Sequence, residues 1–307
     1  MTHNTIPLEQ ARAKQNDIFK VYDLITFLDL DIPPKEDILS PILQTQSLSM
    51  LYAKRGIGKT HIGLNIALAI SSGTDFLMWS APTPRKTLYI DGEMPAITIQ
   101  QRLKDIAQTN EKKHLPDYFN IFTPDMQIAG MPDLSTPEGQ EQYEPFVEDA
   151  EFIIIDNIST LARTGKENEA EGWLPIQAWA LNMRSRGKSV MFIHHAGKGG
   201  QQRGTSRRED VLDLVMTLKH PEDYKTQDGA RFEVHYEKAR NLIGNQAKPF
   251  EAKLTPHGWT YCDIEDAEFN RVIDLHKDGL STREIEEETG VSKSKANRII
   301  KKYKEEM

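Results

Sequence analysis

Short apolar runs alternate with longer stretches of helical periodicity between about residues 46 and 259. The runs in the middle of this region are continuously apolar, which is typical of strands covered on both faces. Strands that alternate with helices predict an α/β fold with a largely parallel central sheet and crossover helices. The expected strands are Leu48–Tyr52, Thr87–Ile90, Tyr118–Phe122, Phe152–Asp156, Ser189–His194, Val211–Lys219 and Phe232–Lys238.

The two ends of the chain have a different pattern. Asp17–Leu28 has helical periodicity that ends before Pro33 and Pro34, so residues 1–40 are expected to form an N-terminal arm. This arm would cap the core, and a docking arm between subunits is the alternative. Residues around 257–266 lose the strand pattern and are expected to form a linker.

Residues 267–307 predict a small all-α domain. Its expected helices are Glu268–Lys277, Thr282–Thr289 and Ser292–Lys304. The predicted organisation is therefore an arm (1–40), an α/β core (41–260) and a helical C-terminal module (267–307).

Charge and cysteine content exclude some classes of protein for this chain. The formal net charge of −8 argues against non-specific coating of nucleic acid or membrane, although it permits local basic patches. The single cysteine, Cys262, excludes an internal disulfide framework and favours a reducing compartment. We find no secretory signal and no apolar run as long as a membrane span. We therefore expect a soluble, cytoplasmic protein without a membrane partner.

A phosphate-binding loop is predicted where the first strand meets the first long helix. Residues 53–60 read Ala-Lys-Arg-Gly-Ile-Gly-Lys-Thr and depart from the usual pattern at Ala53, where a glycine normally stands. Lys59 would contact the β- and γ-phosphates, and the Thr60 hydroxyl would bind Mg²⁺. A glycine-rich turn before an ordinary helix is the alternative. The predicted nucleotide contacts are Ala53, Lys54, Arg55, Gly56, Ile57, Gly58, Lys59, Thr60 and His61.

Two other strand ends supply carboxylates. Asp156 ends an apolar run and would hold Mg²⁺ beside Thr60, or would simply cap the next turn. Glu93 follows the second expected strand and could accept the proton of a water that attacks the γ-phosphate. Asp91 is the less favoured base, and a carboxylate placed by the helix dipole is the non-catalytic alternative.

A double histidine and a basic, glycine-rich loop follow the strand Ser189–His194. His194 or His195 could donate a hydrogen bond to the γ-phosphate, and a solvated or buried histidine pair is an equal alternative. A zinc site is not expected, because neighbouring residues on a strand point to opposite faces. The loop would contact single-stranded DNA or would be an ordinary solvated loop. Its predicted DNA contacts are Lys198, Arg203, Arg207 and Arg208.

Lys238 and Arg240 lie on one face at the end of the last long strand. Two cations in this position suit a finger that reaches the γ-phosphate of a neighbouring subunit. An ordinary ion pair with Glu233 or Glu237 is the alternative.

These segments resemble the RecA-like ATPases of the RepA type, the hexameric replicative helicases of mobilisable plasmids and their relatives on mobile elements. The resemblance covers about residues 20–255 and rests on Ala53–Thr60, Glu93-Met94-Pro95, Asp156, Phe192–Gly199 and Arg203–Ser206. It implies a RecA-like P-loop core, ATP and Mg²⁺ as cofactors, and a homo-oligomer in which a hexamer is favoured. It also implies that Glu93 is the catalytic base and that His194 or His195 senses the γ-phosphate.

The arginine finger is the point at which this chain departs from the RepA group. That group has an arginine where this chain has Asp213. The Lys-Ala-Arg-Asn segment at Lys238 is similar to that of DnaB-type helicases, in which the lysine and the arginine act in trans. The finger is therefore assigned to Lys238 and Arg240.

The C-terminal module resembles the helix-turn-helix units of resolvases and repressors over Leu280–Lys293. Gly290 would supply the bend and Ser292 would cap the third helix, which is basic as a major-groove reader should be. Glu286 departs from the small residue usual at this position, and a three-helix protein-interaction module is the alternative. The predicted contacts with duplex DNA are Lys293, Lys295 and Arg298.

These features together favour a Mg-ATP-dependent, DNA-associated ATPase that works as a helicase-like motor in a ring. A DNA-bound ATP switch or loader without unwinding is one alternative. A nucleotide-sensing transcriptional regulator is the other.

Overall fold

The computed structural model describes residues 14–15, 19–108, 115–163, 170–197 and 210–306. The chain divides into two units, Met1–Glu36 and Asp37–Met307. Among the helices of these described residues, none is both long and apolar enough to cross a bilayer.

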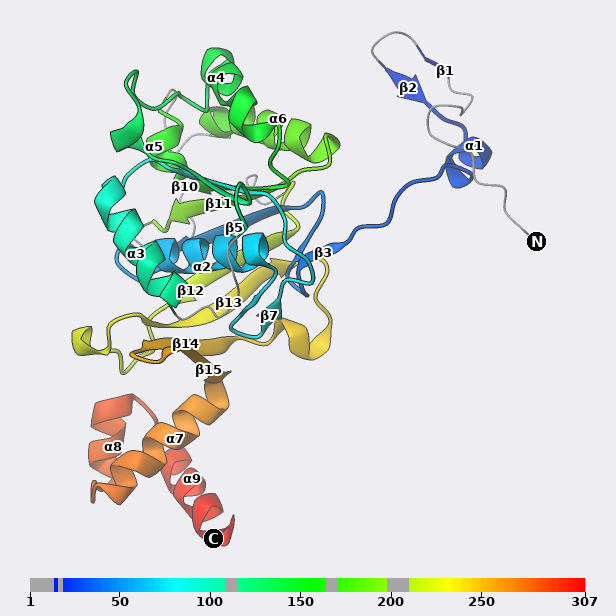
Figure 1. Ribbon diagram of the computed structural model, residues 1–307. Helices are drawn as coiled ribbons and strands as arrows, with labels where there is room; N and C mark the ends of the chain where they lie inside the picture. Colours follow the sequence, from blue (N-terminus) through cyan, green and yellow to red (C-terminus); the bar gives the residue numbers. More distant parts are fainter. Residues whose placement is uncertain (1–13, 16–18, 109–114, 164–169, 198–209, 307) are drawn as a thin grey trace. The chain divides into compact units, whose positions relative to one another are not determined.

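A nine-stranded sheet forms the centre of the second unit (Figure 1). The strand order is β15-β14-β13-β12-β5-β11-β10-β8-β9. The strands from β12 to β9 pair in parallel, and β13, β14 and β15 extend the sheet as antiparallel neighbours. The predicted α/β fold with a largely parallel sheet is confirmed. The strands are β5 (Leu48–Ala53), β8 (Thr87–Asp91), β9 (Phe119–Phe122), β10 (Phe152–Asp156), β11 (Ser189–His195), β12 (Leu214–Lys219), β13 (Arg231–Ala239), β14 (Phe250–Thr255) and β15 (Gly258–Asp263).

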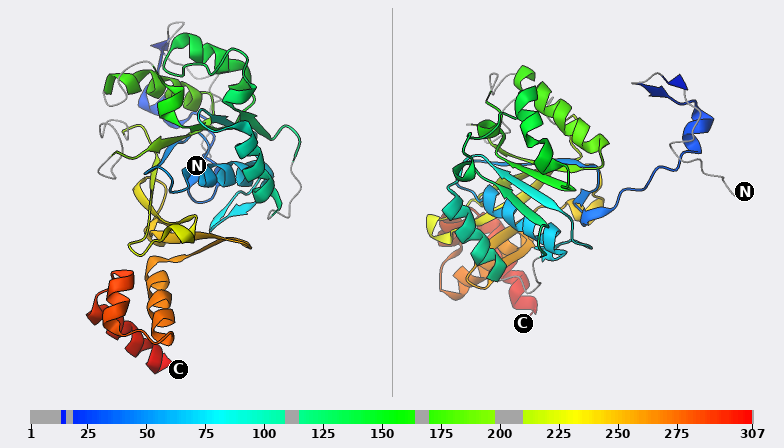
Figure 2. Two further views of the ribbon diagram at one scale, coloured as in Figure 1. Left: turned by 90° about the vertical axis from the view of Figure 1, so that its left-hand side faces the viewer. Right: turned by 45° about the horizontal axis from the view of Figure 1, so that its top comes forward.

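Helices cover both faces of this sheet (Figure 2). Because successive strand residues point to opposite faces, Tyr89 and Ile154 pack in the apolar cluster beneath α2, whereas Ile90 and Ile155 pack in the cluster with α4 and α6. Both faces are apolar, which explains the continuous hydrophobic runs in the sequence. The helices are α2 (Lys59–Ser72) and α3 (Ala96–Gln108) on one face, and α4 (Pro137–Val147), α5 (Ile158–Leu161) and α6 (Ala170–Ser185) on the other.

The register of the parallel strands aligns their carboxyl ends at one edge. Ala53 pairs with His195, and Asp156 pairs with Asp91 on one side and with Ile193 on the other. Segments that are far apart in the sequence therefore meet where the strands stop, which is where ligands bind in open α/β sheets.

A hairpin replaces the linker that was predicted around residues 257–266. β14 and β15 pair across a turn that contains Pro256 and Gly258, and α7 (Ile264–Lys277) begins directly after β15. The sheet thus extends to Asp263 rather than to residue 260. Pro and Gly mark a tight hairpin turn as readily as a domain boundary, and only the pairing of the strands distinguishes the two.

Shorter elements complete the second unit before the C-terminal module. They are the strand pairs β3 (Asp37–Leu39) with β4 (Leu43–Gln44) and β6 (Asp75–Phe76) with β7 (Trp79–Ser80), and the 3₁₀ turns η1 (Pro124–Met126), η3 (Thr226–Asp228) and η4 (Gly244–Ala247).

The first unit contains β1 (Lys14–Gln15), β2 (Lys20–Val21) and α1 (Leu24–Leu28). The helix is shorter than the predicted Asp17–Leu28. Asp23 is its N-cap, because its side chain accepts a hydrogen bond from the backbone N–H of Thr26 at 3.0 Å.

The C-terminal module consists of α7, α8 (Thr282–Thr289) and α9 (Lys293–Glu306), which agrees with the three predicted helices. Ser281 caps α8 with its side chain, and Gly290 ends α8 in the left-handed conformation at φ +73°. The identity of the module as a helix-turn-helix unit stays a prediction. Its own small core contains Val272, Ile273, Ile285, Val291, Ala296 and Ile300.

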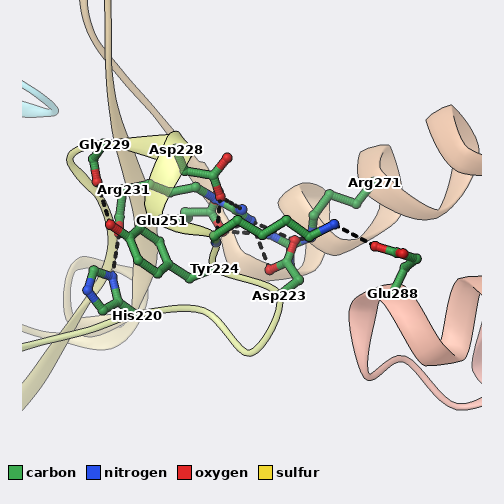
Figure 3. Close-up of polar contacts among 10 residues, drawn as sticks. His220, Asp223, Tyr224, Asp228, Gly229, Arg231, Glu251, Arg271 and Glu288 are labelled. Atoms are coloured by element: carbon green, nitrogen blue, oxygen red, sulfur yellow. Dashed lines mark hydrogen bonds and ion pairs between the residues drawn. The ribbon is translucent and has the colours of Figure 1, made fainter.

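A cluster of ion pairs joins this module to the sheet (Figure 3). The guanidinium of Arg231 on β13 lies 3.0, 3.0 and 2.9 Å from the carboxylates of Asp223, Asp228 and Glu251. Arg271 on α7 shares Asp223 and Glu251 at 3.3 and 2.7 Å. Buried charges are tolerated only when they are paired in this way, so the cluster holds α7 against the antiparallel strands.

Candidate nucleotide-binding site

The predicted phosphate-binding loop connects β5 to α2. Gly56 and Gly58 have φ values of +82° and +120°, which favour glycine strongly, and a side chain at Gly58 would also press on the ring of Phe232 at 3.2 Å. Ala53 is the last residue of β5. An alanine is therefore acceptable there, because strand backbone does not require glycine.

Lys59 is the first residue of α2 and is 6% exposed. Its ammonium donates to the carbonyl oxygens of Ala53 and Lys54 at 3.1 and 3.0 Å. Burial lowers the pKa of Lys59, while the negative charges of Asp156 and Glu93 act against this. The loop carbonyls thus hold the ammonium at the floor of the phosphate-binding loop.

Thr60 and Asp156 form a pair of oxygen ligands of the kind that Mg²⁺ prefers. The Thr60 hydroxyl donates to Asp156 Oδ2 at 2.8 Å, and the Tyr89 hydroxyl donates to the same oxygen at 2.6 Å. Burial raises the pKa of Asp156, and the hydrogen bonds from Tyr89 and Thr60 act against this. A hydroxyl and a carboxylate side by side at the mouth of the loop fit a hard divalent cation.

Glu93, Asn157 and His195 form a second cluster. Asn157 Nδ2 donates to Glu93 Oε2 at 2.6 Å and lies 3.3 Å from His195 Nε2, which is 3.6 Å from Glu93 Oε2. Burial and the charge of Lys59 lower the pKa of His195, so its ring is neutral at neutral pH. The cluster therefore combines a half-exposed carboxylate with a neutral imidazole.

The two clusters and the loop enclose a cavity of about 600 Å³. Residues 55–61 line it together with Glu93, Asp156 and His195, so the structure brings most of the predicted nucleotide site together. Of the two histidines, His195 lines the cavity, and His194, one position earlier in the strand, is fully buried. Lining residues that the sequence did not point to are Arg102, Asn157, Gly229 and Ala230.

Arg102 and Asn157 were missed for different reasons. Asn157 directly follows the acid that ends β10, so its position in the sequence could have suggested it. Arg102 lies on α3, and its charge, after burial, lowers the pKa of His61 at the cavity. A lone arginine in an amphipathic helix carries no local pattern that distinguishes it from a solvated one.

Lys238 and Arg240 lie away from this cavity within one chain. β13 is antiparallel to β12, so Ala239 pairs with Leu214, whereas Leu218 at the other end of β12 pairs with Ala53. The two cations are therefore at the sheet edge opposite the phosphate-binding loop. They cannot complete the site of their own subunit, and action in trans stays a prediction.

Asp213 stands where the RepA group has an arginine, and it has a structural role. Its Oδ2 accepts a hydrogen bond from the backbone N–H of Leu48 at 3.1 Å, and its Oδ1 lies 3.4 Å from a guanidinium nitrogen of Arg240. Arg240 also donates to the carbonyl of Asp210 at 3.1 Å. These contacts hold the base of β12 and orient Arg240 at the same edge.

The predicted DNA contacts fall into two groups. Those of the core loop, Lys198, Arg203, Arg207 and Arg208, lie outside the described residues. On α9, Lys293, Lys295 and Arg298 are exposed, although Lys293 lies 3.8 Å from Glu286 and Lys295 lies 2.7 Å from Glu268.

Comparison with known proteins identifies related folds and a family. The fold is similar to that of a KaiC-like protein from the hyperthermophilic archaeon Pyrococcus horikoshii OT3, with a TM-score of 0.50 and 13% identity over 73% of this chain and 93% of that chain. At this identity the similarity shows the fold alone, which is RecA-like. The family model described as an AAA domain matches residues 15–201, more than half of the chain. With its phosphate-binding loop and RecA-like P-loop ATPase fold, the chain belongs to this AAA domain family.

Proposed function

We propose that this protein is a Mg-ATP-dependent, DNA-associated ATPase that works as a helicase-like motor in a ring of identical subunits. The AAA domain family and the RecA-like fold indicate nucleotide hydrolysis. The observation that carries the proposal is the convergence of Lys59, Thr60, Asp156, Glu93 and His195 on one cavity at the phosphate-binding loop.

Four of these side chains, together with Asn157, would take part in hydrolysis as follows. Mg²⁺, held by Thr60 and Asp156, would neutralise charge on the β- and γ-phosphates. Glu93 accepts a proton from water as the water oxygen bonds to the γ-phosphorus, and the bond from that phosphorus to the bridging oxygen breaks to release ADP. Asn157 holds the Glu93 carboxylate in place, and neutral His195 offers an N–H to the γ-phosphate.

Association with DNA is proposed from the positive charge of α9 and of the basic segment that follows β11 in the sequence. α9 exposes cations along its length, and the module has a core of its own, as an independent DNA-binding unit needs. The cations between Lys198 and Arg208 would contact single-stranded DNA, and those of α9 would contact duplex DNA.

Hydrolysis is tested with the full chain, ATP and Mg²⁺. Glu93→Gln should reduce the turnover rate by about 10²-fold or more while ATP binding persists, because the amide cannot accept the proton. Glu138→Gln, on the exposed start of α4, removes one carboxylate elsewhere and should leave turnover unchanged. Unaltered turnover in Glu93→Gln would remove the assigned base.

The link to DNA needs a separate assay. ATP-driven displacement of one strand of a forked duplex supports the motor, whereas DNA-stimulated hydrolysis without displacement supports a switch or loader. Lys293→Glu with Arg298→Glu should weaken duplex binding, with a shallower salt dependence, relative to Lys104→Glu on α3. Duplex binding that is insensitive to these α9 changes would favour a protein-interaction module.

A further inference from the structure

The hydroxyl of Tyr89 lies behind the candidate magnesium site. Tyr89 is at the centre of β8 and is fully buried, and its ring does not line the nucleotide cavity. Ile154 is its partner on β10, so Asp156 lies two residues further toward the edge on the same face. The side chain reaches along the sheet, and its hydroxyl ends 2.6 Å from Asp156 Oδ2.

Both hydrogen bonds to Asp156 end on the same oxygen. Thr60 donates to Oδ2 from α2 at 2.8 Å, and Tyr89 donates to Oδ2 from β8. Two donors from different elements determine the rotation of the carboxylate about its side-chain bonds. Asp156 lines the cavity, so its second oxygen, Oδ1, would be the one to contact a cation or its water shell.

Gly63 shows that the helix makes room for this arrangement. A glycine is disfavoured in the interior of a helix, yet Gly63 lies one turn after Thr60 in α2. A Cβ at this position would lie 2.6 Å from Ile193 Cδ1 and 3.2 Å from the Tyr89 hydroxyl. Any side chain at residue 63 would therefore clash with Ile193 and crowd the Tyr89 hydroxyl where it contacts Asp156.

We propose that Tyr89 is a positioning residue for magnesium, which acts by orienting the Asp156 carboxylate in the space that Gly63 leaves open. The inference rests on the proposed function, because it assumes that Thr60 and Asp156 hold Mg²⁺ at a nucleotide. Hydrogen-bond partners behind a metal ligand fix its orientation, and their loss weakens metal affinity without any loss of the ligand itself.

The test compares Tyr89→Phe with Tyr143→Phe in the full chain. Tyr143 is also fully buried, its hydroxyl donates to the carbonyl of Pro132 at 3.1 Å, and neither residue lines the nucleotide cavity, so it is a matched control for the loss of one buried hydroxyl. Binding of a fluorescent ATP analogue is titrated with Mg²⁺ and is repeated in excess chelator.

Tyr89→Phe should raise the Mg²⁺ concentration at half-saturation by about tenfold and should leave binding of the metal-free analogue unchanged. Tyr143→Phe should match the wild type in both titrations. Gly63→Ala, which keeps the hydroxyl but crowds it, should shift the Mg²⁺ midpoint in the same direction as Tyr89→Phe.

Two results would overturn the inference. One is a Mg²⁺ midpoint in Tyr89→Phe equal to that of the wild type. The other is an equal loss of metal-free and metal-dependent binding, which indicates a merely structural role. If the wild type itself shows no Mg²⁺-dependent nucleotide binding, the result contradicts the proposed function rather than the role of Tyr89.

Discussion

Asp91 ends β8 at the nucleotide cavity, with 1% of its surface exposed. Its Oδ2 accepts hydrogen bonds from the backbone N–H groups of Glu93 and Met94 at 3.1 and 2.8 Å. Burial raises the pKa of Asp91 from 3.8 to about 7, the hydrogen bond from Met94 acts against this, and the charge of Asp156 adds to it. The ionised form is therefore disfavoured in the folded protein.

The pH dependence of stability follows from this pKa. Between the unfolded value of 3.8 and the folded value of about 7, the folded state binds more protons than the unfolded state. The contribution of Asp91 to stability is then fully present below the unfolded pKa and is lost as the pH rises through about 7.

Asp91→Asn should remove this penalty at high pH, because the amide does not ionise and keeps an oxygen that accepts the backbone hydrogen bonds. Its melting temperature relative to the wild type should rise by roughly 3 °C or more between about pH 5.5 and about pH 8.5. Asp125→Asn, an exposed carboxylate that accepts from the backbone N–H of Ala96, is the control. A difference that is constant with pH would contradict the prediction.

At the scale of single residues, some members of the candidate site could be predicted from local sequence and others could not. Lys59, Thr60 and Glu93 could be placed at one site from the sequence, because loop chemistry and strand ends are local and the edge of a parallel sheet collects them. Arg102 and Tyr89 could not, since each reaches the site by packing against an element that is distant in sequence.

At the scale of elements, β13 connects the nucleotide cavity to the C-terminal module. Gly229 and Ala230, just before this strand, line the cavity. The Phe232 ring lies under Gly58 of the phosphate-binding loop, and Arg231 is in the ion cluster that binds α7. One short segment thus contacts both the candidate nucleotide site and the C-terminal module.

Arg231→Met tests the importance of this segment for folding. The change removes the guanidinium that contacts three carboxylates and leaves Arg271 to pair with two of them. The loss of one partner from a buried ionic cluster typically costs about 3–5 kcal/mol. The midpoint of urea unfolding, followed by tryptophan fluorescence, should fall accordingly.

Arg186→Met provides the exposed counterpart. Arg186 also contacts two carboxylates, those of Glu144 and Glu148, but its side chain is 29% exposed, compared with 8% for Arg231. Its loss should cost no more than about 1 kcal/mol. Equal destabilisation by the two changes would mean that burial of the Arg231 cluster is not the source of its stability.

At the scale of the whole molecule, the position of Lys238 and Arg240 has a consequence for assembly. They lie at the sheet edge opposite the cavity of their own chain, so a role in hydrolysis requires a neighbouring subunit. Trans action predicts that two different inactive subunits complement each other.

A mixing experiment tests this expectation. Glu93→Gln has an intact finger, and Arg240→Ala has an intact pocket, so each alone should be inactive. In an equal mixture, about a quarter of the interfaces combine an intact pocket with an intact finger, and turnover should recover toward that fraction. An equal mixture of Arg240→Ala with Lys238→Ala tests whether both cations are needed in one finger. An inactive mixture of the first pair at concentrations where oligomers form would exclude the finger.

Local patterns were sufficient for the α/β fold, the phosphate-binding loop and the acid that ends β10, because periodicity and strand-end chemistry are properties of neighbouring residues. The fold itself was needed to select His195 from the histidine pair, to replace a linker with the β14–β15 hairpin, and to separate Lys238 and Arg240 from the cavity of their own chain. Each of these depends on strand direction, register or pairing with distant segments, which arise only when the sheet assembles.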